Sequence, residues 1–293
     1  MGMHPLAIVT MVRGDHRMME KWMAHYAPMV HAPTALHVFL HGEDAELARI
    51  AQGASVTTLP YDATGAGFEE ARRGLFFGTV RALLGYYRHV IVTDSDEFIV
   101  LDPQAGSSLG DYLDQRDIPG IALSPLGFDV VHRTADEPDG IVFDRPILSQ
   151  RSFGFADGSY SKPCIFRRPP QSGNQHQLKG EDWVIDPNIL LFHLRFFDLE
   201  LGEQVARARE QQTRQFDSHG ARHDIGTWSD RLARLRRAIQ QVNDGEPAPL
   251  TGEAADAFAA RQVANYESRG KRLMWRDSRH GPYKIPERFR GML

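Results

Sequence analysis

Short runs of apolar and β-branched residues alternate with amphipathic segments in the first part of the chain. The runs have the length and composition of buried strands and cover residues 5–12, 35–41, 55–62 and 90–93. The segments between them carry apolar residues at helical spacing, as Trp22 and Tyr26 illustrate. This order predicts an α/β fold with a mostly parallel, doubly wound central sheet, flanked by helices and joined by right-handed crossovers.

The pattern is less regular beyond the first four strands. Residues 120–132 predict strands interrupted by Pro125 and Gly127. Residues 133–158 are rich in Asp, Gly, Pro and Arg, which favours a long loop over an active site. Residues 189–194 form an apolar run that predicts one more buried strand, although a histidine, His193, interrupts it.

After residue 198 the chain becomes helical in pattern. Amphipathic segments cover residues 198–216, 230–245 and 254–273. We therefore expect a binding and catalytic domain over residues 1–200, followed by a C-terminal helical extension with a basic tail over residues 201–293.

The strand over residues 90–93 ends in three carboxylates, Asp94, Asp96 and Glu97. Burying an unpaired carboxylate is costly, and three at one strand end would repel each other. A divalent cation with oxygen ligands would relieve this repulsion, whereas an acidic surface turn would leave all three groups in water. Open α/β sheets bind ligands at the carboxyl ends of their strands, so we favour a metal site that includes Asp94 and Asp96.

Two segments together resemble a known family. The stretch TMVRGDHRMMEKWMAHY, followed by VIVTDSDEFIVL, is similar to bacterial glycosyltransferases of the GT-A fold, in the family-2-like group with a D-x-D-E-F motif. The resemblance covers roughly residues 5–200. It implies a Rossmann-like sheet, a UDP- or GDP-sugar donor, and a Mn²⁺ or Mg²⁺ ion held through the D-x-D. It also implies a hexosyltransferase-like activity on a carbohydrate or lipid-linked acceptor, in the synthesis of surface or capsular polysaccharide or of a glycoconjugate.

The resemblance also suggests which residues bind the donor. The turn after the first strand holds the base and ribose in that family, which makes Thr10, Arg13 and Asp15 candidates. A basic residue ahead of the D-x-D strand would bind the diphosphate, and among Arg72, Arg73 and Arg81 we choose Arg81. The remaining candidates for donor binding are Asp62, at the end of the third strand, Asp94, and Lys162, which would neutralise the diphosphate or the leaving group.

Catalytic and further metal-binding residues are expected late in the domain. Histidine inside an apolar run is usually a core residue, but the family often recruits a late histidine as a metal ligand, and we rank His193 above His176 for this role. Glu181 and Asp182 look like the acidic pair near the acceptor in inverting enzymes of the group. Asp182 would take the proton of the attacking hydroxyl, and the alternative is a pair of solvated loop acids.

Composition and charge indicate the cellular compartment in which we expect the protein. The chain has one cysteine, Cys164, no apolar run of about twenty residues, and an N-terminus that enters a strand directly, so we expect a cytoplasmic protein. Residues 1–200 carry 17 basic and 26 acidic residues, and residues 201–293 carry 17 and 12. The basic C-terminal part is either a solvated helical face or a peripheral contact with the inner face of an anionic membrane.

Two other functions fit parts of the pattern. A metal-dependent nucleotidyl- or phosphotransferase would also place acids at strand ends, but it needs a Gly- and Lys-rich triphosphate loop, and RGDHR is a poor one. A non-catalytic nucleotide-binding module is the other alternative. Nucleic acid is not an expected partner, because the first 200 residues are acidic and no basic groove pattern is present in the sequence.

Overall fold

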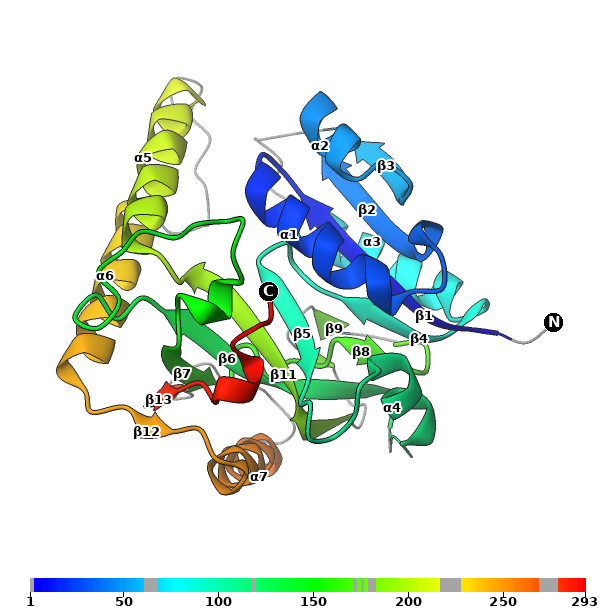
Figure 1. Cartoon of the computed structure of the whole chain (residues 1–293). Coiled ribbons are helices and arrows are strands. Elements are labelled where there is room, and N and C mark those ends of the chain that lie inside the picture. The colour runs from blue at the N-terminus through cyan, green and yellow to red at the C-terminus, as the bar shows by residue number, and fades with distance from the viewer. Residues whose placement is uncertain are drawn as a thin grey trace.

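A computed structural model gives the fold of the chain (Figure 1). It describes residues 3–60, 68–116, 118, 120–170, 173–174, 177–178, 183–216, 228–268 and 279–293. Over these residues the chain is a mixed α/β structure with a central sheet flanked by helices, as the sequence predicted.

The first four strands form the parallel half of the sheet. They are β1 (His4–Val12), β2 (Leu36–His41), β3 (Ser55–Leu59) and β4 (Tyr87–Val92). β1 lies between β2 and β4, β3 lies outside β2, and each of these pairs is parallel. The connecting helices are α1 (His16–Tyr26), α2 (Ala45–Ile50) and α3 (Phe68–Leu83). The predicted doubly wound arrangement is therefore confirmed for this half.

Side chains of β1 alternate between two cores. Leu6 and Ile8 pack in the same cluster as Trp22 of α1, whereas Ala7 and Val9 share a cluster with Phe76 of α3. The two helices consequently cover opposite faces of the sheet, with α1 in front of β1 in Figure 1. Burial on both faces explains why β1 reads as an unbroken apolar run.

The second half of the sheet is mixed. β6 (Ala122–Val131) and β11 (Trp183–Phe196) pair in parallel, and β5 (Glu97–Leu101) runs antiparallel to β11. β7 (Phe153–Asp157) and β8 (Ile165–Phe166) both pair antiparallel to β6, and β8 joins β6 to β4. The described strands of this half are partly antiparallel, because loops and hairpins, and not only helices, connect them.

β6 continues through Pro125 and Gly127, where the sequence predicted an interruption. On one side of β6, β8 pairs with Ala122 and Leu123 and β7 pairs with 128–130, so no described strand pairs with Pro125 on that side. On the other side Pro125 is in register with Asp186 of β11, next to a shift of register in that pair. Gly127 is needed for a different reason, since the backbone of Tyr160 and Ser161 lies directly against it.

The C-terminal segment is helical in part and also extends the sheet. Its helices are α5 (Leu199–Phe216), α6 (Trp228–Asp244) and α7 (Gly252–Ser268). α6 packs Leu235 and Ile239 against Phe153 of β7 and Phe196 of β11. β12 (Ala248–Pro249) and β13 (Arg279–Lys284) then join the same sheet, β13 antiparallel to β7. Residues 201–293 thus supply an edge of the main sheet as well as the expected helices.

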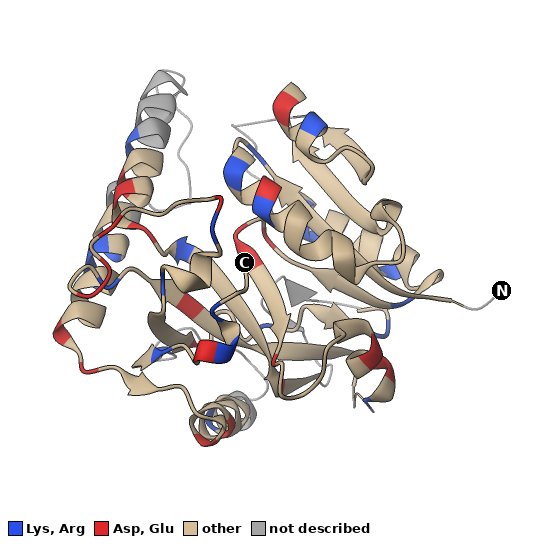
Figure 2. Ribbon diagram, in the orientation of Figure 1, with Lys and Arg blue, Asp and Glu red and all other residues tan. Residues whose placement is uncertain are grey.

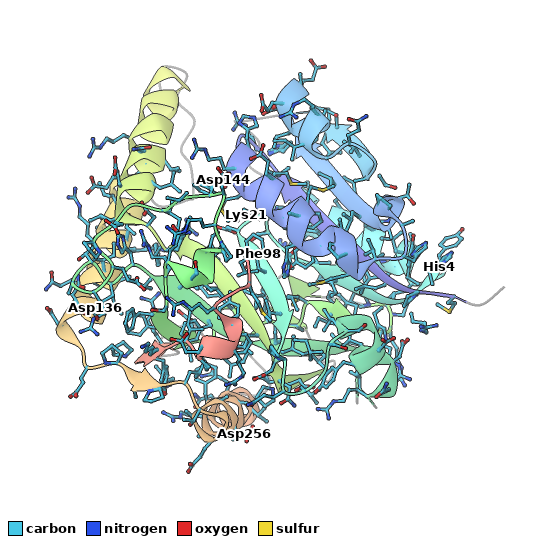
Figure 3. All side chains as sticks on the ribbon, in the orientation of Figure 1. His4, Lys21, Phe98, Asp136, Asp144 and Asp256 are labelled. Carbon is cyan, nitrogen blue, oxygen red and sulfur yellow. The ribbon has the colours of Figure 1, made fainter. Side chains whose placement is uncertain are left out.

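The loop between β6 and β7 lies against α1. Lys21 Nζ donates to Arg145 O at 3.3 Å, and the Lys21 side chain lies beside Asp144 in Figure 3. The remaining elements are α4 (Leu109–Gln115), the strands β9 (Gly173–Asn174) and β10 (Gln177–Leu178), and the single turns η1 (Ala27–Met29), η2 (Pro33–Ala35), η3 (Ile147–Ser149) and η5 (Glu287–Phe289). Among the described helices, none combines the length and the apolar character needed to cross a membrane.

Candidate active site

The D-x-D segment forms the turn between β4 and β5, at the carboxyl end of the parallel strands. α1 fixes both sides of this turn. Trp22 Nε1 donates to Thr93 Oγ1 at 3.0 Å, just before the turn. Just after it, Tyr26 Oη donates to Glu97 O at 3.0 Å and accepts from the N–H of Ile99 at 2.8 Å. The amphipathic pattern of α1 therefore also places two polar groups that hold the turn.

Glu97 is built into the turn. Its Oε2 accepts the N–H of Asp94 at 2.9 Å, and its Oε1 accepts from Lys162 Nζ at 2.7 Å. Both side chains of this ion pair are about 2% exposed. Burial lowers the pKa of Lys162, but the adjacent Glu97 and Asp94 raise it more, so the pKa lies above its ordinary value and the ammonium stays charged.

The two aspartates of the turn have different partners. Asp94 accepts from Arg72 Nη2 of α3 at 2.5 Å. Asp96 Oδ2 lies 3.5 Å from Nε2 of His193, which stands on β11 in register with Glu97. The β5–β11 pairing therefore brings a predicted metal-binding aspartate and the predicted histidine together (Figure 2 shows the acidic positions at the start of β5).

Besides Asp96, two other side chains contact His193. Its Nδ1 lies 2.9 Å from Asp129 Oδ1, and the ring of Tyr160 stacks on it with centroids 3.8 Å apart. Asp129 in turn accepts from Arg279 Nη2 at 2.6 Å. Burial lowers the pKa of His193, but Asp96 and Asp129 outweigh this and raise it to about 9. Burial raises the pKa of Asp96, but His193 outweighs it and brings the pKa below its ordinary value.

The donor set at this turn fits a divalent cation. Two neighbouring ligands at about 2.1 Å from an octahedral ion lie roughly 3 Å from each other, close to the 3.5 Å between Asp96 Oδ2 and His193 Nε2. Within the described residues, no group of three His, Cys, Asp or Glu side chains forms a complete metal site. A cation bound by one or two carboxylates and completed by substrate phosphates is the arrangement usual for Mg²⁺.

Basic groups gather at the ends of β1 and β2. Burial lowers the pKa of His41, and the positive charges of Arg13 and Arg72 lower it further, which places both guanidinium groups near the end of β2. Gly14, next to Arg13, has a φ of 62° and turns the chain from β1 towards α1. This cationic group adjoins the D-x-D turn through the Arg72–Asp94 ion pair. Such a group suits phosphates.

Other predicted donor-binding residues lie in varied surroundings. Thr10 is fully buried within β1, and its hydroxyl oxygen has no hydrogen-bond partner. Asp15 directly precedes α1. Arg81 donates to Pro170 O at 3.2 Å. Among the three arginines considered on α3, Arg72 is therefore the one that pairs with the D-x-D turn.

Four candidate residues lie outside the described part of the chain. They are Asp62, His176, Glu181 and Asp182. The roles assigned to them from the sequence stay predictions.

Sequence reasoning missed Asp129 and Arg279. A signal for Asp129 was present, because it is a single carboxylate inside the apolar run of β6. Nothing local indicated Arg279, which lies 150 positions away from Asp129.

Comparison with known proteins gives structural likenesses only. No protein-family model matches the chain, and no curated protein matches it in sequence. A mannosyltransferase, PcManGT from Pyrobaculum calidifontis, solved in complex with GDP-Man and Mn²⁺, is 12% identical with a TM-score of 0.36; the match covers 91% of this chain and 81% of that one. Residues 1–349 of TarS from S. aureus are 12% identical with a TM-score of 0.34, covering 96% and 99%. Both TM-scores lie below 0.5, so the function of this chain is inferred from its own residues.

Proposed function

We propose that this chain is a metal-dependent glycosyltransferase, which moves a sugar from a nucleoside diphosphate sugar to an acceptor hydroxyl. The observation that carries the proposal is the pairing of Asp96 with His193 at the carboxyl end of the sheet, next to the positive charges of Arg13 and Arg72. A carboxylate and an imidazole suit a divalent cation, and the adjoining positive charges suit a diphosphate.

The protein's own groups have distinct tasks in this reaction. Asp96 and His193 would hold Mn²⁺ or Mg²⁺, with Asp94 beside them. When bound, the cation stabilises the charge that develops on the departing diphosphate. Arg72 and Arg13 would bind phosphate oxygens, and the buried Lys162–Glu97 pair keeps the turn in place. Positioning and charge stabilisation are then the main contributions of the chain.

The transfer also needs a base for the acceptor hydroxyl, because an alcohol is too weak an acid to attack unaided. Asp182 is our choice, from its position along the chain between the acceptor-side strands and the strand bearing His193. A carboxylate base contributes typically about 10²–10⁴-fold in rate. Asp182→Asn should lower turnover by about this factor and leave donor binding unchanged, with Glu181→Gln as the milder control. A product that keeps the donor's anomeric configuration would exclude this role.

Donor binding tests the proposal directly. Melting temperatures are measured with UDP-, GDP-, CMP- and dTDP-sugars, each with and without Mn²⁺. A ligand at 100 times its Kd adds about 2.7 kcal/mol, which corresponds to a shift of several degrees. We expect one nucleotide class to give such a shift, only with Mn²⁺ present. A panel without any metal-dependent shift would sink the proposal.

A variant and its matched control locate the site. Asp96→Asn should fold and lose the metal-dependent shift, because it removes the carboxylate that faces His193. Asp256→Asn, on the exposed face of α7 (Figure 3), should behave as the parent does. If Asp96→Asn binds nucleotide and Mn²⁺ unchanged, the metal is held elsewhere. The sugar, the acceptor and membrane contact through the basic C-terminal part stay predictions beyond this experiment.

A further inference from the structure

We propose that Asp129 is a positioning residue that orients His193 towards the metal, and that Arg279 of β13 fixes Asp129 for this task. The inference rests on the proposed function, since it concerns the metal site described above. It extends that site from the D-x-D turn to β6 and to a strand contributed by the C-terminal segment.

The hydrogen-bonding groups define which nitrogen of His193 faces the turn. Asp129 Oδ1 lies 2.9 Å from Nδ1, and Asp129 is fully buried. A carboxylate only accepts, so Nδ1 carries the hydrogen of this bond. Nε2, the atom that lies 3.5 Å from Asp96 Oδ2, is then the nitrogen that would bind a cation, which would take the place of the Nε2 proton that the ring carries without metal. Carboxylate–histidine pairs of this kind orient metal ligands and raise their basicity.

Asp129 has one partner for each of its oxygens. Oδ1 faces His193, and Oδ2 accepts from Arg279 Nη2 at 2.6 Å. The guanidinium of Arg279 lies 5.1 Å from the ring centroid of Phe155, and its Nε lies 3.3 Å from Asp157 Oδ2. With both oxygens engaged, the Asp129 carboxylate is held in one orientation.

The ring of His193 is fixed across its face as well as at its edge. Tyr160 stacks on it with an interplanar angle of 24°. A buried aspartate whose only task was to neutralise Arg279 would not require a histidine of fixed plane beside it. The combination of a stacked ring, a held Nδ1 and an Nε2 aimed at the D-x-D turn is what a metal ligand needs.

The variant Asp129→Asn tests the orientation of the His193 ring without a large change in the volume of the side chain at residue 129. The amide has nearly the same volume, but Arg279 requires the oxygen of the amide, which leaves the NH₂ group facing His193 Nδ1. This arrangement moves the ring hydrogen to Nε2, where it blocks a cation. The matched control is Asp157→Asn, which also changes a carboxylate beside Arg279 and does not contact His193 within the described hydrogen bonds.

The experiment uses the full chain and Mn²⁺ alone, with bound ion measured by electron paramagnetic resonance and by calorimetry. We expect Asp129→Asn to bind Mn²⁺ about 10–100-fold more weakly, the range usual for a lost outer partner of a metal ligand. Asp157→Asn should stay within about twofold of the parent. Arg279→Gln, a partly exposed position, should also weaken binding, and it carries the test if Asp129→Asn does not fold.

Three outcomes would overturn the inference. If Asp129→Asn folds and binds Mn²⁺ as tightly as the parent, the positioning role is excluded while the proposed function stands. The same conclusion follows from parent-like Mn²⁺ affinity of Arg279→Gln if Asp129→Asn does not fold. An equal loss in Asp157→Asn would trace the effect to general disturbance around Arg279. Absence of Mn²⁺ binding by the parent itself would remove the proposed metal site, and the inference with it.

Discussion

At the scale of single residues, each of the three carboxylates in the acidic turn has a different partner. Asp94 pairs with Arg72, Asp96 faces His193, and Glu97 accepts both a backbone N–H of the turn and the ammonium of Lys162. The three carboxylates were grouped together from the sequence, where their charges are adjacent. In the fold each has its own cation or donor, and this relieves much of their mutual repulsion.

Glu97→Gln should destabilise the protein strongly. Removing one partner of a buried ion pair typically costs about 3–5 kcal/mol, because the other charge is left buried and unpaired. Lys162 would be that charge, at 2% exposure. The free energy of unfolding from denaturant titration measures the effect. Glu46→Gln, which breaks the exposed pair with Arg49, should cost less than about 1 kcal/mol. Similar costs for the two variants would contradict the buried-pair interpretation.

At the scale of elements, β6 links the sheet to the candidate site through a close backbone contact. A Cβ at Gly127 would lie 2.3 Å from the carbonyl carbon of Tyr160 and 2.5 Å from the N of Ser161. The N–H of Gly127 also donates to Ser161 Oγ at 2.8 Å. The segment that packs on β6 here carries the ring that stacks on His193. The position of this segment therefore depends on the absence of a side chain at residue 127.

Gly127→Ala should destabilise the fold by about 1–3 kcal/mol or more, because the obstructing atoms belong to the backbone. The same variant should weaken Mn²⁺ binding, since Tyr160 would have to move. Gly78→Ala on α3 is the control. Nothing lies within 4 Å of its added Cβ, and alanine is favoured over glycine in helices by about 0.5–1 kcal/mol. Denaturant titration measures the free energy of unfolding of both variants. A Gly127→Ala variant as stable as Gly78→Ala would contradict the close backbone contact at Gly127.

At the scale of the whole molecule, several partly or fully buried histidines are spread over both halves of the fold. Burial lowers the pKa values of His37, His89 and His132, and it lowers that of His25 to about 4. The Nε2 atom of His25 lies 2.9 Å from the backbone carbonyl oxygen of Ile99 in β5. These groups make the stability of the protein sensitive to acid.

Stability should fall as the pH is lowered from about 6.5 to 4. An unfolded chain binds protons on these histidines near pH 6.5, whereas the folded protein binds them only at lower pH, so acid favours the unfolded state. His25 alone contributes on the order of 3 kcal/mol over this window. Denaturant titrations at pH 7, 5.5 and 4.5 check this, and His25→Gln should show a shallower loss. Equal stability at the three pH values would refute the prediction.

The sequence by itself determined the parallel half of the sheet and the position of the D-x-D turn. Each depends on local periodicity, since strands buried on both faces read as apolar runs and amphipathic helices read at a spacing of three to four. The same local signal predicted that His193 stands on a buried strand, which β11 confirms.

Only the tertiary structure decided which side chains meet at that turn. Among Arg72, Arg73 and Arg81 the sequence favoured Arg81, and the packing of α3 brings Arg72 to Asp94. Asp129 and Arg279 meet because β13 returns to pair with β7 beside β6, across 150 positions of sequence. Pairing between distant strands leaves no periodic trace in either strand, so these contacts follow from the assembled sheet.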